Sequence, residues 1–131
     1  MATAPRNEIP PGTLEMLILR TLAPKRELHG FQIAEAIEFG SEDVLQVEEG
    51  SLYPALQRML LKGWIAGEWG RTAGNRRARY YELTALGRRQ LEREVESYQR
   101  VSVAIARILG GATMTTATAA TAAGGAPVPR R

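Results

Sequence analysis

The segment of residues 47–63 constrains the fold most, because it combines both helix-boundary signals with a buried stripe. Ser51 is a suitable N-cap, which would place Pro54 at the third helical position, where a missing N–H breaks no intrahelical bond. Gly63 is suited to follow the last helical turn. Apolar side chains recur between them at three- and four-residue spacing, at Leu52, Leu56, Met59 and Leu60. The segment therefore predicts an amphipathic helix that begins after Ser51 and ends before Gly63.

The polar side of this helix carries groups that suit the major groove of DNA. Its first turn offers unpaired backbone amides and the positive end of the helix dipole, which attract phosphate. The side chains that point away from the apolar stripe are Ser51, Tyr53, Gln57, Arg58 and Lys62. An ordinary amphipathic surface helix has the same pattern, so this segment alone leaves both interpretations open.

Composition narrows the class of protein. A chain of 131 residues with 44% hydrophobic residues can bury one core of moderate size, so we expect one domain with tails. Because there is no cysteine and only one histidine, we expect no metal site, no cofactor and no enzymatic activity. The net charge of +3 favours a polyanionic partner only weakly. No apolar run reaches the roughly 18 residues that span a bilayer, so we expect a cytoplasmic protein without a membrane partner.

The first half of the chain predicts two further helices. Residues 1–10 are expected to be a flexible leader, and Thr13 is a plausible N-cap for a helix over residues 13–23. That helix is apolar almost all round, so Leu17 is expected to contact a second subunit; the alternative is a fully internal helix of a monomer. His29 is expected to cap a second helix that ends at Gly40. Its predicted apolar stripe comprises Phe31, Ile33, Ala34 and Ile37, and a one-rung strand should follow within residues 44–47.

Residues 64–83 predict a basic β-hairpin. Residues 64–69 and 79–83 are rich in β-formers, and the loop between them contains two glycines and an asparagine. Arg71, Arg76 and Arg77 would lie at or near its tip. Three helices followed by such a hairpin form the order of a winged helix, whose wing lies along the phosphate backbone or enters the minor groove. The alternative is that these arginines are ordinary solvent-exposed loop residues without a role in binding.

A last helix is expected from Thr84 to about Leu109, where Gly110 and Gly111 would stop it. A rod of this length cannot bury its apolar seam on its own domain, so we expect it to dimerise. The predicted seam consists of Leu91, Val95, Tyr98, Ser102, Ile105 and Leu109. The domains are thus a winged-helix domain over residues 11–83, a dimerisation helix over 84–110 and a disordered Ala/Thr-rich tail over 111–131.

Five motifs together resemble the PadR family of bacterial transcriptional regulators. In chain order they are Pro11-Gly-Thr-Leu14, His29-Gly-Phe31, Glu49-Gly-Ser-Leu-Tyr-Pro-Ala-Leu56, Gly63-Trp-Ile65 and Arg79-Tyr-Tyr-Glu-Leu-Thr-Ala-Leu-Gly87. The resemblance implies a mainly α (α+β) winged helix-turn-helix with a two-stranded wing and a long C-terminal dimerisation helix. It also implies a homodimeric repressor on a palindromic operator of double-stranded DNA, released in some relatives by a phenolic or other flat hydrophobic effector.

The resemblance also implies residue roles. The start of the family's recognition helix falls on Gly50, Ser51 and Tyr53, where Gly50 would allow close approach to the duplex. The wing carries Asn75, Arg76, Arg77 and Arg79. The chain departs from many relatives at Glu48, which replaces a serine, and at Ala78, which replaces a position that is often basic. On the last helix Tyr98 is the only aromatic residue available to an effector. The alternative function is a non-enzymatic interaction module that binds an acidic protein partner.

Overall fold

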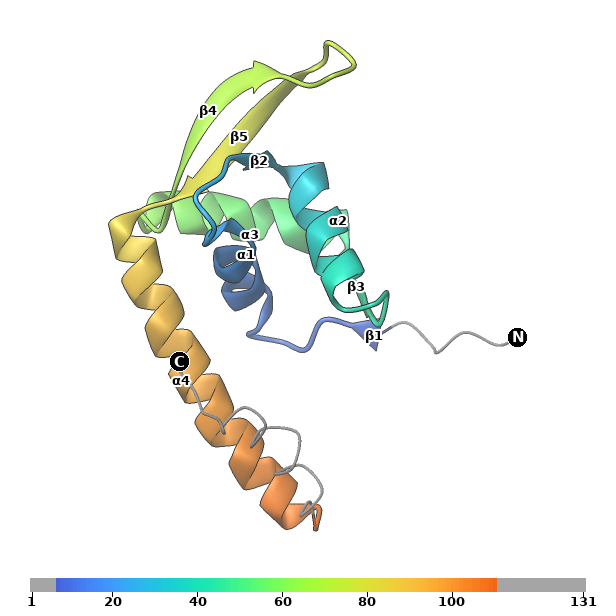
Figure 1. Cartoon of the computed structure of the whole chain (residues 1–131), viewed down its shortest axis with the longest axis vertical. Coiled ribbons are helices and arrows are strands. Elements are labelled where there is room, and N and C mark those ends of the chain that lie inside the picture. Colours follow the sequence, from blue (N-terminus) through green and yellow to red (C-terminus); the bar gives the residue numbers. More distant parts are fainter. Residues whose placement is uncertain (1–6, 111–131) are drawn as a thin grey trace, which may run out of the picture. The chain divides into compact units, whose positions relative to one another are not determined.

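The structure, a computed structural model, describes residues 7–110. Its elements follow the order β1, α1, β2, α2, β3, α3, β4, β5, α4 (Figure 1). The chain divides after Arg93 into two units, which are taken in turn. The helices and the hairpin expected from the sequence are present, so the prediction of a mainly α winged helix-turn-helix is confirmed.

Helix α1 (Leu14–Leu22) forms the centre of the core of the first unit. Ile18, Leu19 and Leu22 are completely buried, and the helix contacts α2, α3 and β5. Thr13 is the N-cap residue as predicted, but its side chain does not cap the helix. Its hydroxyl donates instead to the carbonyl oxygen of Pro10, at 2.8 Å.

Helix α2 (Gly30–Gly40) begins with a reciprocal capping box. The Nδ1 atom of His29 accepts from the backbone N–H of Gln32, and the Gln32 side chain accepts from the backbone N–H of His29. The predicted capping role of His29 is therefore confirmed. The prediction that Phe31 belongs to the buried stripe is wrong, because the stripe runs through Ile33 and Ile37 and leaves Phe31 61% exposed on the other side of the helix.

Helix α3 (Glu49–Leu61) begins three residues earlier than predicted. Glu48 is extended, and its carbonyl oxygen accepts from the backbone N–H of Leu52 at 2.9 Å, so Glu48 and not Ser51 occupies the N-cap position. Pro54 therefore lies inside the helix and leaves the carbonyl of Gly50 without its helical donor. Because Gly50 is exposed, water can satisfy that carbonyl.

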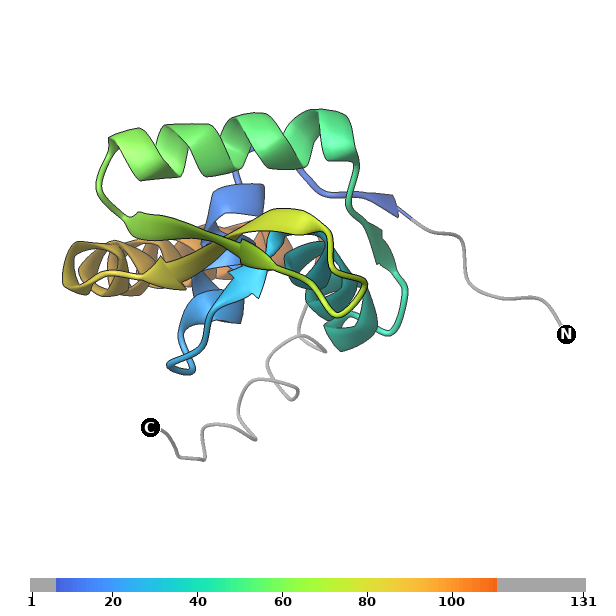
Figure 2. The same cartoon turned by 90° about the horizontal axis from the view of Figure 1, so that it is seen from above.

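The end of α3 agrees with the sequence. Gly63 has a φ of 77°, the left-handed conformation that glycine adopts without strain. Its N–H donates to Leu60, and the N–H of Trp64 donates to Met59. These two bonds form a Schellman motif, so the prediction of Gly63 as the residue that closes the helix is confirmed. Seen from above, α3 stretches across the first unit along one edge (Figure 2).

The main sheet has three strands in the order β2 (Leu28–His29), β5 (Arg77–Leu83), β4 (Ile65–Arg71). The hairpin of β4 and β5 is antiparallel, pairs Ile65 with Leu83 and Arg71 with Arg77, and projects beyond the helices (Figure 1). The strands are longer than predicted, because residues 70–71 and 77–78 continue the ladder and leave only residues 72–76 as the turn.

Two short strands lie where the sequence predicted a loose leader and a single rung. β1 (Asn7–Glu8) pairs in parallel with β3 (Leu45–Gln46), and the N–H of Asn7 donates to the carbonyl of Val44 at 2.7 Å. The expectation that the chain is loose throughout residues 1–10 is therefore wrong for Asn7 and Glu8, whose partner strand lies far away in the sequence. Residues 1–6 lie outside the described part of the chain.

The start of α4 (Ala85–Ile108) is fixed to the end of α3 and the base of the hairpin. The Thr84 hydroxyl accepts from the N–H of Gly87 at 3.0 Å, which confirms Thr84 as the cap, and donates to the carbonyl of Gly63 at 2.7 Å. The backbone N–H of Thr84 donates to the carbonyl of Trp64. This junction leaves no room above Gly87, where a Cβ atom would lie 2.0 Å from the carbonyl oxygen of Trp64.

The second unit contains the rest of α4, which ends at Ile108 as predicted to within one residue. Gly110 follows with a φ of 77°, the conformation expected of a glycine just beyond a helix. The predicted tail over residues 111–131 lies outside the described residues.

Gly87→Ala should destabilise the first unit, because the clash is with backbone that cannot rotate away. Overpacking of this kind costs about 1 to 3 kcal/mol, and a backbone clash should reach or exceed the upper figure. Thermal unfolding measures the loss. Gly40→Ala is the matched control, because a Cβ atom there meets nothing within 4 Å and the glycine has no positive φ. Equal melting temperatures for the two variants would contradict this assignment.

Candidate nucleic-acid interface

The β4–β5 hairpin has two chemically different faces. Successive side chains of a strand point to opposite sides, and the register places Trp69 opposite Arg79 and Arg71 opposite Arg77. These four residues therefore share one side, which we call the arginine face. It is the side on which Ile65 and Tyr81 are buried, so it continues from the face that covers the core.

Cation–π contacts organise the arginine face. The guanidinium carbon of Arg77 lies 4.2 Å from the centre of the Trp69 ring, and that of Arg79 lies 5.8 Å from it. Arg71 is held differently, because its side chain donates to the carbonyl of Asn75 in the turn at 3.2 Å. The three predicted wing arginines on the strands are thus brought together on one surface, which can attract phosphate.

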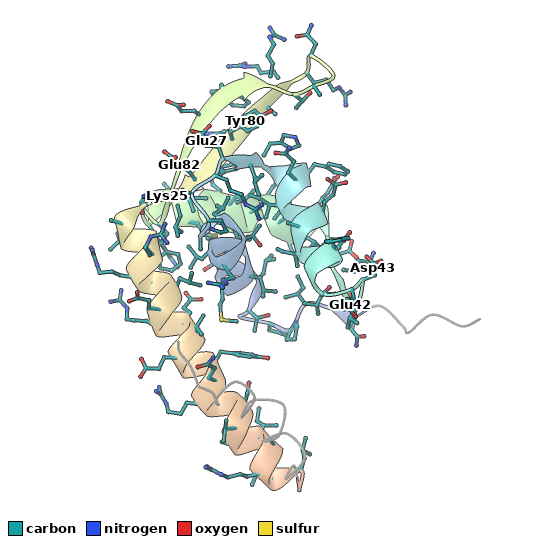
Figure 3. The ribbon with its side chains drawn as sticks, in the orientation of Figure 1. Lys25, Glu27, Glu42, Asp43, Tyr80 and Glu82 are labelled. Carbon is teal, nitrogen blue, oxygen red and sulfur yellow. The ribbon has the colours of Figure 1, made fainter. Side chains whose placement is uncertain are left out.

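The opposite side of the hairpin carries acidic groups. Glu68, Tyr80 and Glu82 alternate with the residues of the arginine face, and Glu27 lies beside them. Figure 3 shows Glu27, Tyr80 and Glu82 together on this outer side. The Tyr80 hydroxyl donates to the carbonyl of Arg71 at 2.9 Å, which ties the outer face to the base of the turn. Carboxylates repel phosphate, so only the arginine face suits a nucleic acid.

The turn of the hairpin carries the other two predicted wing residues. Asn75 has a φ of 64°, a conformation that asparagine tolerates better than most residues, so its position is explained by the turn itself. The N–H of Arg76 donates to the Thr72 hydroxyl, while the Arg76 residue itself is exposed. Arg76 is therefore free to extend from the tip of the wing.

Tyr53 connects α3, the predicted recognition helix, to α2. Its ring lies over Gly30, where a Cβ atom would be 2.8 Å from the Tyr53 hydroxyl. Burial raises the pKa of the Tyr81 phenol, while Arg79 lowers it and Tyr53 raises it, so these three side chains are electrostatic neighbours. Tyr53 is 47% exposed and thus packs on α2 with one side and faces solvent with the other.

The remaining predicted residues of α3 divide by helical periodicity into a central ridge and one flank. Gly50 and Gln57 are exposed on the ridge. Ser51 and Arg58 lie on the flank, where they help to line an open cavity of about 450 Å³ bounded by residues 8–12. Arg58 is paired with Glu15 of α1, with Nε 2.9 Å from the carboxylate. Arg58 would have to leave this partner in order to bind phosphate.

The predicted dimer residues are distributed over both units. Leu91 is buried within the first unit and Leu17 is half-buried there. In the second unit Val95 and Ser102 are partly exposed, whereas Tyr98, Ile105 and Leu109 are exposed. Leu91 thus packs within its own subunit, so the prediction that it lies in a free seam is wrong.

Two candidate interface residues were missed by the sequence analysis. The sequence pattern identifies Trp69 only as a β-former, although the residue is 59% exposed and its ring contacts two arginines. Leu61 is 79% exposed at the end of the α3 ridge. Trp69 lies two residues before Arg71, a spacing that places both side chains on the same face of a strand. This spacing is the sequence signal that identifies Trp69.

Within residues 7–110, no group of three or more metal-binding side chains is brought together. None of the described helices combines the length and the apolar character that a bilayer crossing requires. The geometry places the α3 ridge beside the arginine face of the hairpin. The ridge can enter a groove of DNA while the arginine face contacts the phosphates that border it.

Known proteins share this fold. The model of the transcriptional regulator PadR-like family matches residues 18–93, more than half of the chain. The chain belongs to this family. A PadR-like transcriptional regulator of Bacillus cereus is 30% identical, with a TM-score of 0.61 over 75% of this chain and 92% of that one. A PadR family transcription regulator of Clostridium difficile is 29% identical, with a TM-score of 0.63 over 75% and 99%.

The fold is also that of Bacillus subtilis PadR, whose structure was solved in complex with operator DNA. That protein is 23% identical and has a TM-score of 0.56, over 63% of this chain and 47% of its own. The protein is thus a PadR-like transcriptional regulator with a winged-helix fold.

Proposed function

We propose that this PadR-like regulator is a cytoplasmic, non-enzymatic repressor that binds a palindromic operator as a homodimer. The observation that carries the proposal is the arginine face, which gathers Arg71, Arg77 and Arg79 on the side of the hairpin continuous with the core and Tyr53 of α3. A wing that is cationic on one side only can lie against the phosphate backbone while α3 enters the adjacent major groove. Bacillus subtilis PadR, whose fold this chain shares, was solved in complex with operator DNA, which supports DNA as the partner.

The proposal assigns different tasks to α3 and the hairpin. Gly50 stands in open space, with nothing within 4 Å of a Cβ position, and it has no positive φ, so the fold does not require a glycine there. Close approach of the α3 backbone to DNA would explain it. Gln57 shares the ridge and can read a base edge. The wing arginines instead contact the phosphate backbone of DNA, which is the same for every base sequence.

Replacing Arg76 and Arg77 with Ala should weaken binding to operator and random duplexes alike and flatten the salt dependence. Each phosphate contact contributes about 0.9 to the slope of log affinity against log salt, so two arginines in two subunits should remove up to about 4 units. Fluorescence anisotropy over a salt series measures both effects. An unchanged slope would show that these wing arginines do not contact DNA phosphates. Failure of the wild-type protein to prefer any duplex in a random-sequence selection would favour an acidic protein partner instead.

In the same binding experiment, Gly50→Ala tests whether the backbone of α3 approaches the duplex. Alanine is up to about 1 kcal/mol better than glycine in a helix, so the melting temperature should stay constant or rise. Operator affinity should fall more than affinity for random DNA, because the added methyl group obstructs the approach of α3 and not that of the wing. Undiminished operator preference in this variant would show that the α3 backbone does not approach the duplex at residue 50.

For the homodimer, the proposal rests on the exposed apolar side chains of the second unit. The proposed seam keeps Tyr98 and Ile105 of the predicted seam and takes the exposed Val101 and Ile108 in place of Ser102 and Leu109. These four residues follow one another at steps of three, four and three, which is the spacing of a coiled-coil seam. Their exposed fractions range from 49% for Tyr98 to 85% for Ile108. A second copy of the helix would cover this seam, and the two subunits would then address two half-sites of the operator.

Ile105→Glu should dissociate the dimer, because it places like charges across the seam and removes an apolar contact worth about 1.5 to 3 kcal/mol in each subunit. Val103→Glu is the matched control, since Val103 is 43% exposed on the same helix but lies off the seam. Sedimentation should report a monomer for the first variant and a dimer for the second. Dissociation of both variants, or of neither, would contradict the proposed interface.

Tyr98 is also where we place a flat hydrophobic or phenolic effector, because its exposed ring is the only aromatic group on α4. Simple phenols should then release the wild-type protein from DNA and should fail to release a Tyr98→Ala variant. Anisotropy of the labelled duplex during a phenol titration measures the release. Equal release of both proteins would place the effector elsewhere, and release of neither would argue against it.

A further inference from the structure

We propose that Trp69 is a positioning residue of the DNA interface, which holds the guanidinium groups of Arg77 and Arg79 ready for phosphate. The inference rests on the proposed function and deepens it by naming the residue that organises the wing. In this role the indole ring does not contact bases itself. It fixes two cations on one side of a thin hairpin before DNA arrives.

The geometry of the hairpin supports this role. Trp69 on β4 is paired directly with Arg79 on β5, and Arg77 is its diagonal neighbour two residues further along. The guanidinium carbons of Arg77 and Arg79 lie 4.2 Å and 5.8 Å from the ring centre. Trp69 is 59% exposed, so it contributes little to the core. Its main described contacts are those of its ring with the two arginines.

Arg79 is the more tightly fixed of the two arginines. Its Nε atom is buried without a hydrogen-bond partner in the described structure, although most buried donors have one. The side chain crosses the face of Gly67, where a Cβ atom would lie 2.7 Å from Nε. A glycine at position 67 therefore lets Arg79 lie flat on the sheet beside Trp69. With Nε covered, only the terminal nitrogens of Arg79 remain for a phosphate.

Stacking on a ring is compatible with phosphate binding because the two interactions use different parts of the guanidinium group. The ring attracts the flat face of the cation, whereas the N–H groups point outward in the plane and can donate to phosphate oxygens. An arginine held in this way has lost its rotamer freedom before binding, so less conformational entropy is lost when DNA binds. The stacked ring also keeps Arg77 and Arg79 in place despite their mutual repulsion.

The test compares Trp69→Leu and Trp69→Phe in the full-length protein by anisotropy over a salt series. A dimer would contain four arginine–ring contacts, so Trp69→Leu should lower affinity for operator and random duplexes alike by about 10- to 100-fold. Its salt slope should fall toward that of the Arg77→Ala variant. Trp69→Phe keeps a π face and should restore most of the affinity and slope. Matching melting temperatures show that both variants remain folded.

A double-mutant cycle separates positioning from a direct contact. In an Arg77→Ala background Trp69→Leu should cost much less than in the wild type, because one of the groups it positions is gone. In an Arg76→Ala background it should cost the full amount, because Arg76 lies in the turn and has no described contact with the ring. Equal losses in both backgrounds, or a loss confined to operator DNA with an unchanged salt slope, would overturn the inference. Absence of any DNA binding by the wild type would instead refute the proposed function.

Discussion

The contact between the first turn of α4 and the chain at Trp64 fixes the arrangement of the first unit. Gly63 follows α3, Trp64 precedes β4, and Thr84 follows β5. Hydrogen bonds join all three residues in one junction. Gly87 allows the helix to come this close. Because α3 ends and the wing begins at this junction, their relative placement depends on a few backbone bonds and not on the long side chains of the arginine face.

The local signals in the sequence were sufficient for the helices and for most of their ends. Thr84 and Gly63 act through hydrogen bonds to residues within one helical turn, so their roles can be predicted without a fold. The N-terminus of α3 was misplaced because Ser51 has the better side chain for a cap, whereas the extended backbone at Glu48 determines where the helix starts. Strands β1 and β2 exist only through distant partners, and two residues carry no pattern of their own.

The candidate interface was predicted in its composition but not in its geometry. Arginines clustered in a hairpin could be recognised, but the side of the sheet on which each lies depends on the register of β4 and β5. The ion pair between Arg58 and Glu15 joins residues that are 43 positions apart and has no local signature. Tyr53 was chosen for its hydroxyl, and its contact with Gly30 emerges only when α2 and α3 are packed. Trp69 gains its significance only from its two cationic neighbours.

The acidic outer face of the hairpin bears on how neighbouring proteins share a stretch of DNA. In the proposed complex, Glu68 and Glu82 lie on the side of the wing turned away from the bound phosphates, where they would present negative charge to any protein bound next to it. Two dimers on adjacent sites would therefore repel each other where their wings approach, and more strongly at low ionic strength. In the proposed complex, this repulsion would disfavour two dimers side by side on random sequence and would favour binding to an isolated site.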